Sequence, residues 1–123
     1  MTEYLTLAEV VAIHEDQIER YGGCKGTRDP GVVEAALYRP QTGYYADVIE
    51  QAAALWESLA QGRAFADGEK RTAFAVMYTF LAINGVPLKA STDEIERVIA
   101  QLGSGGTVGF DALVPWLRER VRM

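Results

Sequence analysis

The feature that most constrains this fold is an apolar run between Thr72 and Asn84. At helical spacing its apolar side chains fall on nearly every side of a helix instead of on one stripe. They are Ala73, Phe74, Ala75, Val76, Met77, Tyr78, Phe80, Leu81, Ala82 and Ile83. A helix without a polar face has to be enclosed by other elements. The run therefore predicts a buried central helix, which Gly85 ends and Pro87 prevents from resuming.

Helical periodicity also dominates the rest of the chain. Capping signals predict helices that begin after Thr6, at Pro30, after Asp47, after Ser91 and near Asp111. Their predicted ends lie before Gly22 and near Arg39, Gln61, Gly103 and Val121. The segment from Pro40 to Ala46 reads as an ordered loop or a short strand. No long alternating pattern supports a sheet. The prediction is an all-α fold of about six helices, with the central helix surrounded by the others.

Length and composition limit the class of protein. The 123 residues are 49% hydrophobic, enough for the core of a single domain spanning residues 1–123. A formal net charge of −5 argues against broad nucleic-acid binding. No apolar run approaches the roughly 20 residues that span a bilayer. The acidic start lacks the basic region of a signal peptide, and Cys24 is the only cysteine. We therefore expect a cytoplasmic protein without a disulfide.

The candidate chemistry lies in the segment GRAFADGEKRT, from Gly62 to Thr72. It opens onto the N-terminus of the central helix, where free N–H groups and the helix dipole attract an anion. Gly68 lets the backbone approach a phosphate. Lys70 and Arg71 oppose the dipole in the first turn, which favours a compensating anion. Asp67 offers a hard oxygen ligand for Mg²⁺. An Asp-Gly turn and a solvated Lys-Arg pair are the structural alternative, which spacing alone leaves open.

This segment resembles the signature of the Fic/Doc family, His-x-Phe-x-Asp/Asn-x-Asn-Lys/Gly-Arg. Phe65, Asp67, Lys70 and Arg71 match that signature in register. Lysine at position 70, where AMP-transferring members usually carry glycine, is typical of the Doc branch. The first-helix run LAEVVAIH, the YGG that ends this helix, the later DPG and the LAINGV after the central helix also resemble Doc landmarks. The resemblance covers nearly the whole chain.

The resemblance implies a Fic/Doc-like helical domain that acts as the toxin of a toxin–antitoxin module. Doc-type toxins transfer a phosphoryl group from ATP to a threonine of elongation factor Tu, which arrests translation, and a disordered segment of a Phd-like antitoxin silences them. Carried over, positions 63, 67, 70 and 71 are catalytic, and Asp67 holds Mg²⁺. By the same resemblance, the nucleotide phosphates are bound by Gly68, Glu69, Lys70 and Arg71. Phe65 anchors the loop, and residues 40–46 form the flap that positions the target.

Two positions depart from the family pattern. The histidine that serves as general base falls at Arg63, and the asparagine falls at Glu69. Arginine stays protonated and cannot accept a proton. His14 is the only histidine, and a lone histidine on an apolar stripe is more often a core residue than a catalyst. Glu69 either repels ATP or pairs with Arg63 or with a metal ion.

Three interpretations therefore stay open. The chain is a toxin disarmed by substitution, a natural member that keeps only a binding or regulatory role, or an active enzyme whose base is Asp67 or Glu69. Loss of a general base costs about 10²–10⁴-fold in rate, so we expect impaired phosphoryl transfer, with AMP transfer less favoured. An antitoxin groove is also expected. Its candidate anchors are Tyr44, Tyr45, Trp56 and Trp116, although the tryptophans fit a core equally well.

Overall fold

The fold was analysed in a computed structural model that describes residues 1–103 and 108–121. The elements are α1 (Leu7–Tyr21), α2 (Pro30–Tyr38), the 3₁₀ turn η1 (Arg39–Gln41), α3 (Val48–Gln61), α4 (Glu69–Ile83), α5 (Thr92–Gly103) and α6 (Phe110–Arg118). Within these ranges there is no strand, and residues 40–46 form the 3₁₀ turn and bends. The prediction of an all-α fold with six helices is confirmed. No helix in the described part of the chain has the length and apolar character needed to span a membrane.

Capping side chains account for most helix boundaries. Thr6 and Glu9 form the predicted reciprocal capping box before α1. Asp47 accepts a hydrogen bond from the Glu50 N–H at 3.0 Å, which fixes the start of α3. The last helix ends at Arg118, about three residues before its predicted end. The reason is tertiary, because the chain turns there to pair Val121 with Leu88 in an isolated antiparallel bridge.

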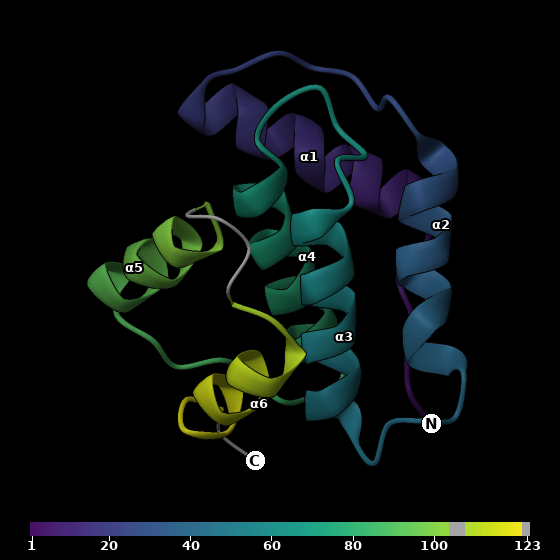
Figure 1. Cartoon of the computed structure of the whole chain (residues 1–123), viewed down its shortest axis with the longest axis vertical. Helices are drawn as coiled ribbons and strands as arrows, with labels where there is room; N and C mark the ends of the chain where they lie inside the picture. Colours follow the sequence, from purple (N-terminus) through teal and green to yellow (C-terminus); the bar gives the residue numbers. More distant parts are fainter. Residues whose placement is uncertain (104–107, 122–123) are drawn as a thin grey trace.

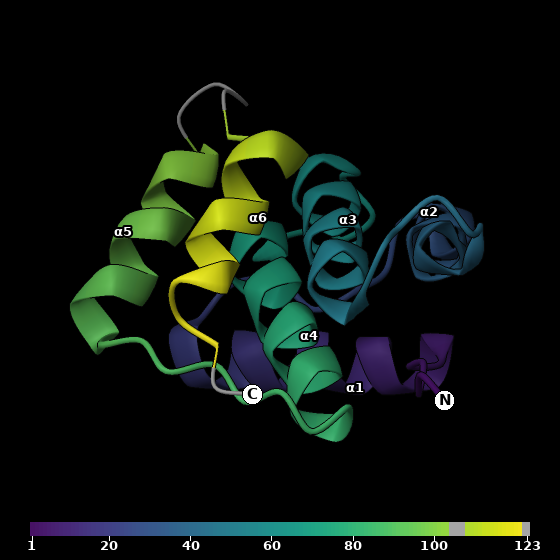
Figure 2. The same cartoon turned by 90° about the horizontal axis from the view of Figure 1, so that it is seen from below.

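The centre of the molecule is a pair of helices, α3 and α4, which lie side by side (Figures 1 and 2). Helices α1 and α5 pack against α4, whereas α2 and α6 pack mainly against α3. Alanines that are wholly buried, Ala52 and Ala53 on α3 and Ala73 on α4, permit this close packing. The predicted single central helix is therefore only half of the centre, and α3 is buried at least as extensively.

One face of α4 is not covered. Tyr78 is 44% exposed on this face, and Ala75 and Thr79 are half-buried. The prediction that α4 is buried on all sides is wrong for this face. This face is exposed because α1 and α5 both contact α4 but leave a strip of α4 open between them. The N-terminus of α4, where the candidate chemistry lies, is at one end of this strip.

Candidate functional site

The loop before α4 is held against the segment that follows α1. Thr27 and Phe65 form an isolated antiparallel bridge. The N–H groups of Arg28 and Asp29 both donate to the carbonyl of Ala64, at 2.7 and 3.1 Å. The side chain of Phe65 is almost wholly buried, which confirms its predicted role as the anchor of the loop. The loop therefore has a fixed backbone although much of its surface faces solvent.

His14 is buried in α1 and reaches the same loop from the core side. Its ring stacks on Phe65 with a centroid distance of 4.2 Å and an interplanar angle of 14°. Its Nε2 lies 2.7 Å from the backbone carbonyl oxygen of Asp67. A carbonyl oxygen only accepts, so Nε2 carries a proton and donates. The prediction of a core histidine is confirmed, and this bond leaves Nε2 unable to act as a base.

The start of α4 is open to an anion. Gly68 precedes the helix in the left-handed conformation, with φ 71° and ψ 21°, and no side chain caps the helix within the described residues. The first N–H groups of a helix have no partner inside it, and the positive end of the dipole lies there. Glycine suits this position, because a side chain is strained at φ 71° and a Cβ would lie 2.9 Å from Cδ1 of Ile18, which would have to shift.

Asp67 lies at the surface beside this helix start. Its carboxylate accepts hydrogen bonds from the Gly68 N–H at 2.9 Å and the Cys24 N–H at 3.3 Å. Gly23 makes this approach possible, since a Cβ there would lie 2.7 Å from Oδ2 of Asp67. The described residues contain no group of three or more side chains able to hold a metal ion. One exposed carboxylate fits Mg²⁺ only as an ion that takes its other ligands from phosphate and water.

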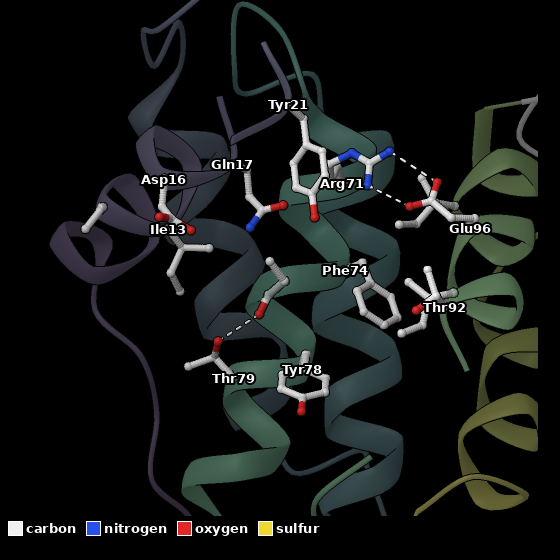
Figure 3. A pocket seen from close by; sticks show the side chains of 14 residues that line it. Ile13, Asp16, Gln17, Tyr21, Arg71, Phe74, Tyr78, Thr79, Thr92 and Glu96 are labelled. Atoms are coloured by element: carbon white, nitrogen blue, oxygen red, sulfur yellow. Dashed lines mark hydrogen bonds and ion pairs between the residues drawn. The ribbon is translucent and has the colours of Figure 1, made fainter. Parts of the chain in front are cut away.

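Both cations of the first turn have carboxylate partners. Lys70 Nζ lies 3.3 Å from Glu69 Oε1, so Glu69 pairs with Lys70 rather than with Arg63. Arg71 donates two hydrogen bonds to Glu96 of α5, at 3.0 and 3.3 Å, as Figure 3 shows. This hydrogen bonding raises the pKa of Arg71 and lowers that of Glu96. The guanidinium carbon also lies 4.1 Å from the ring centroid of Tyr21. An anion at the helix start therefore competes with Glu69 and Glu96.

Arg63 lies six residues before Glu69, the first residue of α4, and has an exposed side chain. Its φ of 54° is the only positive value at a non-glycine position in the described ranges. Left-handed backbone costs an L-residue roughly 1–2 kcal/mol, and asparagine, aspartate and histidine adopt it more readily. No described residue forms a hydrogen bond or ion pair with its guanidinium. Nothing in the described structure therefore explains arginine at this position.

The open strip on α4 is the floor of a groove of about 580 Å³ between α1 and α5 (Figure 3). Its apolar lining is Ala12, Ile13, Phe74, Ala75, Ile95 and Ile99. Its polar and amphipathic lining is Asp16, Gln17, Tyr21, Arg71, Tyr78, Thr79, Thr92 and Glu96. Arg71 and Glu96 thus belong both to the groove and to the region of the anion site.

The predicted anchors lie elsewhere. Trp56 is wholly buried in the core, and Trp116 packs on it with a centroid distance of 5.5 Å. Tyr45 accepts a hydrogen bond from Arg39 at 2.7 Å, and Tyr44 is exposed in the bend beside it. None of the four lines this groove, whose aromatic lining residues are Tyr21, Phe74 and Tyr78. The sequence carried no signal for this, because aromatic residues serve cores and interfaces alike.

The sequence of this chain matches known proteins over the loop and most of the helices. The model of the Fic/DOC family matches residues 4–81, which include the loop and nearly all of α4. Toxin Doc of Mycolicibacterium smegmatis (strain ATCC 700084 / mc(2)155) is 45% identical over 98 residues, which cover 76% of this chain and 73% of that protein. Protein kinase doc of Escherichia phage P1 is 34% identical over 120 residues, 94% of each chain. This chain belongs to the Fic/Doc family.

Proposed function

We propose that this chain is a Doc-like toxin that transfers a phosphoryl group from ATP to a threonine of elongation factor Tu, with activity impaired by Arg63. The observation that carries the proposal is the uncapped start of α4 at Gly68, with Lys70 and Arg71 in its first turn and Asp67 directly before Gly68. A relative whose name is protein kinase doc, aligned over nearly the whole chain, supports phosphoryl transfer. Because the proposed target is an elongation factor, its phosphorylation would arrest translation.

The loop residues can hold a triphosphate. The N–H groups of the first turn of α4 face the phosphate oxygens, and Lys70 and Arg71 neutralise their charge. Asp67 would share Mg²⁺ with the phosphates, which supplies further neutralisation. Arg71 is already paired with Glu96 and Lys70 with Glu69, so a phosphate has to compete with these carboxylates for both cations. We therefore expect ATP to bind weakly and only with Mg²⁺.

The proposed reaction is limited by removal of the proton from the threonine hydroxyl. The threonine oxygen forms a bond to the γ-phosphorus, the bond to the leaving ADP oxygen breaks, and the hydroxyl proton has to go to a base. Arg63 cannot accept it, and Nε2 of His14 already carries a proton that it donates to Asp67. Glu69 is paired with Lys70, and Asp67 is proposed to hold Mg²⁺, so neither carboxylate of the loop is a good acceptor for this proton. Residual transfer is therefore slow.

The groove favours a second candidate function, a catalytically silent module that binds its antitoxin. A Phd-like antitoxin segment with one apolar face fits an apolar channel between two helices. Arg71 lines the groove and is also one of the cations of the proposed anion site. A segment bound there would lie beside α4 whether or not the chain transfers phosphate.

The test compares this chain with its Arg63→His, Glu69→Asn double variant. Radiolabelled transfer from ATP to elongation factor Tu is measured beside growth arrest in cells that express each chain without antitoxin. We expect slow transfer by the parent and fast, toxic transfer by the double variant. Fast transfer by the parent would refute the impairment. ATP binding without transfer by either form would favour the silent module, and absence of ATP binding by both would refute the nucleotide site.

A further inference from the structure

The geometry points to His14 as a positioning residue for the anion site: its Nε2–H orients the Asp67–Gly68 peptide group from which the phosphate-binding turn is built. This inference rests on the proposed function, because it concerns the geometry of the same turn. His14 lies on α1, 53 positions from Asp67 in the sequence, and its ring is buried. It does not touch the reacting atoms, so its role is carried by the backbone that it holds.

The hydrogen bond acts on a planar unit. The carbonyl oxygen of Asp67 and the N–H of Gly68 belong to one peptide group and point in opposite directions. When His14 fixes the oxygen at 2.7 Å, it also fixes the direction of the Gly68 N–H. That N–H donates to Oδ1 of the Asp67 carboxylate at 2.9 Å. The His14 imidazole therefore orients the Asp67–Gly68 peptide group and, through the Gly68 N–H, the carboxylate of Asp67, which is the proposed Mg²⁺ ligand.

The imidazole itself is held in place. Stacking on Phe65 fixes the plane of its ring, and Phe65 is the buried anchor of the loop. A hydrogen bond in a buried, low-dielectric setting is stronger than one exposed to water. A second hydrogen bond reaches Asp67 from outside the loop, from the Cys24 N–H, which is longer at 3.3 Å and comes from an exposed segment. Of these two hydrogen bonds to Asp67, the one from His14 is the shorter and the more buried.

A matched pair of substitutions separates this role from packing. In glutamine the side-chain nitrogen is as many bonds from the backbone as Nε2 of histidine, so His14→Gln keeps a donor within reach of the Asp67 carbonyl. In asparagine the nitrogen corresponds to Nδ1 and falls short. Both variants lose the stacked ring and both remain neutral, so a packing role predicts the same behaviour for the two. His14→Leu adds a variant that has no donor at all.

Three measurements on the full chain test the inference. Nitrogen-15 NMR of the imidazole should show Nε2 protonated in the parent. Amide exchange at Gly68 should be roughly fivefold faster in the Asn and Leu variants than in the Gln variant, as expected for loss of one hydrogen bond. Calorimetric affinity for ATP with Mg²⁺ should fall by a similar factor in the Asn and Leu variants and stay near the parent value in the Gln variant.

An Nε2 without a proton, or equal exchange in the Gln and Asn variants, would overturn the positioning role. Equal ATP affinity in those two variants would confine His14 to packing and overturn it as well. If the parent itself bound no ATP, the proposed function would fail, while the tautomer and the exchange rates would still decide whether His14 orients the turn.

Discussion

At the scale of single residues, position 63 combines an unsuited side chain with an unsuited backbone. Arginine there cannot accept a proton and has a left-handed φ of 54°. Arg63→His should therefore raise phosphoryl transfer by about 10²–10⁴-fold, the usual contribution of a general base. ATP affinity should change little, because a base acts in the transition state and not in the ground state. Transfer rates and calorimetry with ATP and Mg²⁺ measure the two effects.

Arg63→Asn is the matched control for that variant. Asparagine tolerates left-handed backbone as histidine does, but it is not a base. Both variants should melt at or slightly above the temperature of the parent, and only the histidine should gain activity. A gain of equal size in the asparagine variant would show that arginine blocks the site and that the missing base is not the cause.

Glu96 offers a second test at the residue scale. Glu96→Gln removes the carboxylate that competes with phosphate for Arg71. The pair is partly exposed, so it is worth less than about 1 kcal/mol, and ATP affinity should rise by no more than roughly fivefold. Calorimetry measures it, with Asp16→Asn on the opposite rim of the groove as the control, because Asp16 pairs with Arg20 and not with Arg71. Unchanged affinity would show that Arg71 does not reach the phosphates.

The same pair has a predictable dependence on pH. Hydrogen bonding from Arg71 lowers the pKa of Glu96 below its ordinary value of 4.5. The stability it contributes is therefore fully present above pH 4.5 and is lost as the pH falls through the lowered pKa. The parent should lose slightly more stability than Glu96→Gln across that acid range. Parallel melting curves for the two chains throughout that range would contradict the assignment.

The sequence predicted where the loop residues lie along the chain, but it did not predict which distant residues they contact. Asp67, Gly68, Lys70 and Arg71 are local, so their place at a helix start follows from neighbouring residues. Glu96 lies 25 positions from Arg71, and no local pattern links them. His14 was recognised as buried, but its bond to the Asp67 carbonyl depends on how α1 crosses the loop. Gly23 was read as a helix stop, whereas its lack of a Cβ also admits the Asp67 carboxylate.

At the scale of elements, α4 has two faces with different tolerance. Met77 is wholly buried, while Ala75 on the open strip is half-buried. Met77→Asp places an unpaired charge in the core, which costs several kcal/mol and should unfold the domain. Ala75→Asp places its carboxylate at the groove, where water reaches it, and should cost only about 1 kcal/mol. Circular dichroism melts of both variants distinguish this arrangement from burial on all sides, which predicts equal loss.

Helix boundaries were predictable and helix coverage was not. Caps such as Thr6 and Asp47 act within one turn, so a sequence shows them directly. Whether an apolar face is covered depends on the distance between α1 and α5, which no local pattern encodes. An apolar residue such as Ala75 reads the same in a core and in a binding groove. The apolar run of α4 therefore predicted a buried helix, but it did not show that one side of this helix lies open in a groove.

At the scale of the whole molecule, α4 links the two candidate functions. Its N-terminus forms the proposed anion site, and its open side forms the floor of the groove. Arg71 belongs to both, because it lies in the first turn and lines the groove. A segment that occupies the groove can therefore change how Arg71 and Glu96 are paired without touching the rest of the loop. This arrangement would let an antitoxin control a nucleotide site from the side.

The partner surface can be tested with one aromatic pair. Tyr78 lies on the open strip of α4 and lines the groove, whereas Tyr38 on α2 is more exposed and lies outside it. If the groove binds a Phd-like antitoxin segment, Tyr78→Ala should weaken that binding by roughly tenfold, as expected for an aromatic anchor worth about 1–2 kcal/mol. Tyr38→Ala should leave it unchanged. Calorimetry with a peptide of the antitoxin's C-terminal segment measures both. An equal loss in the two variants, or a loss only with Tyr38→Ala, would place the antitoxin on another face of the molecule.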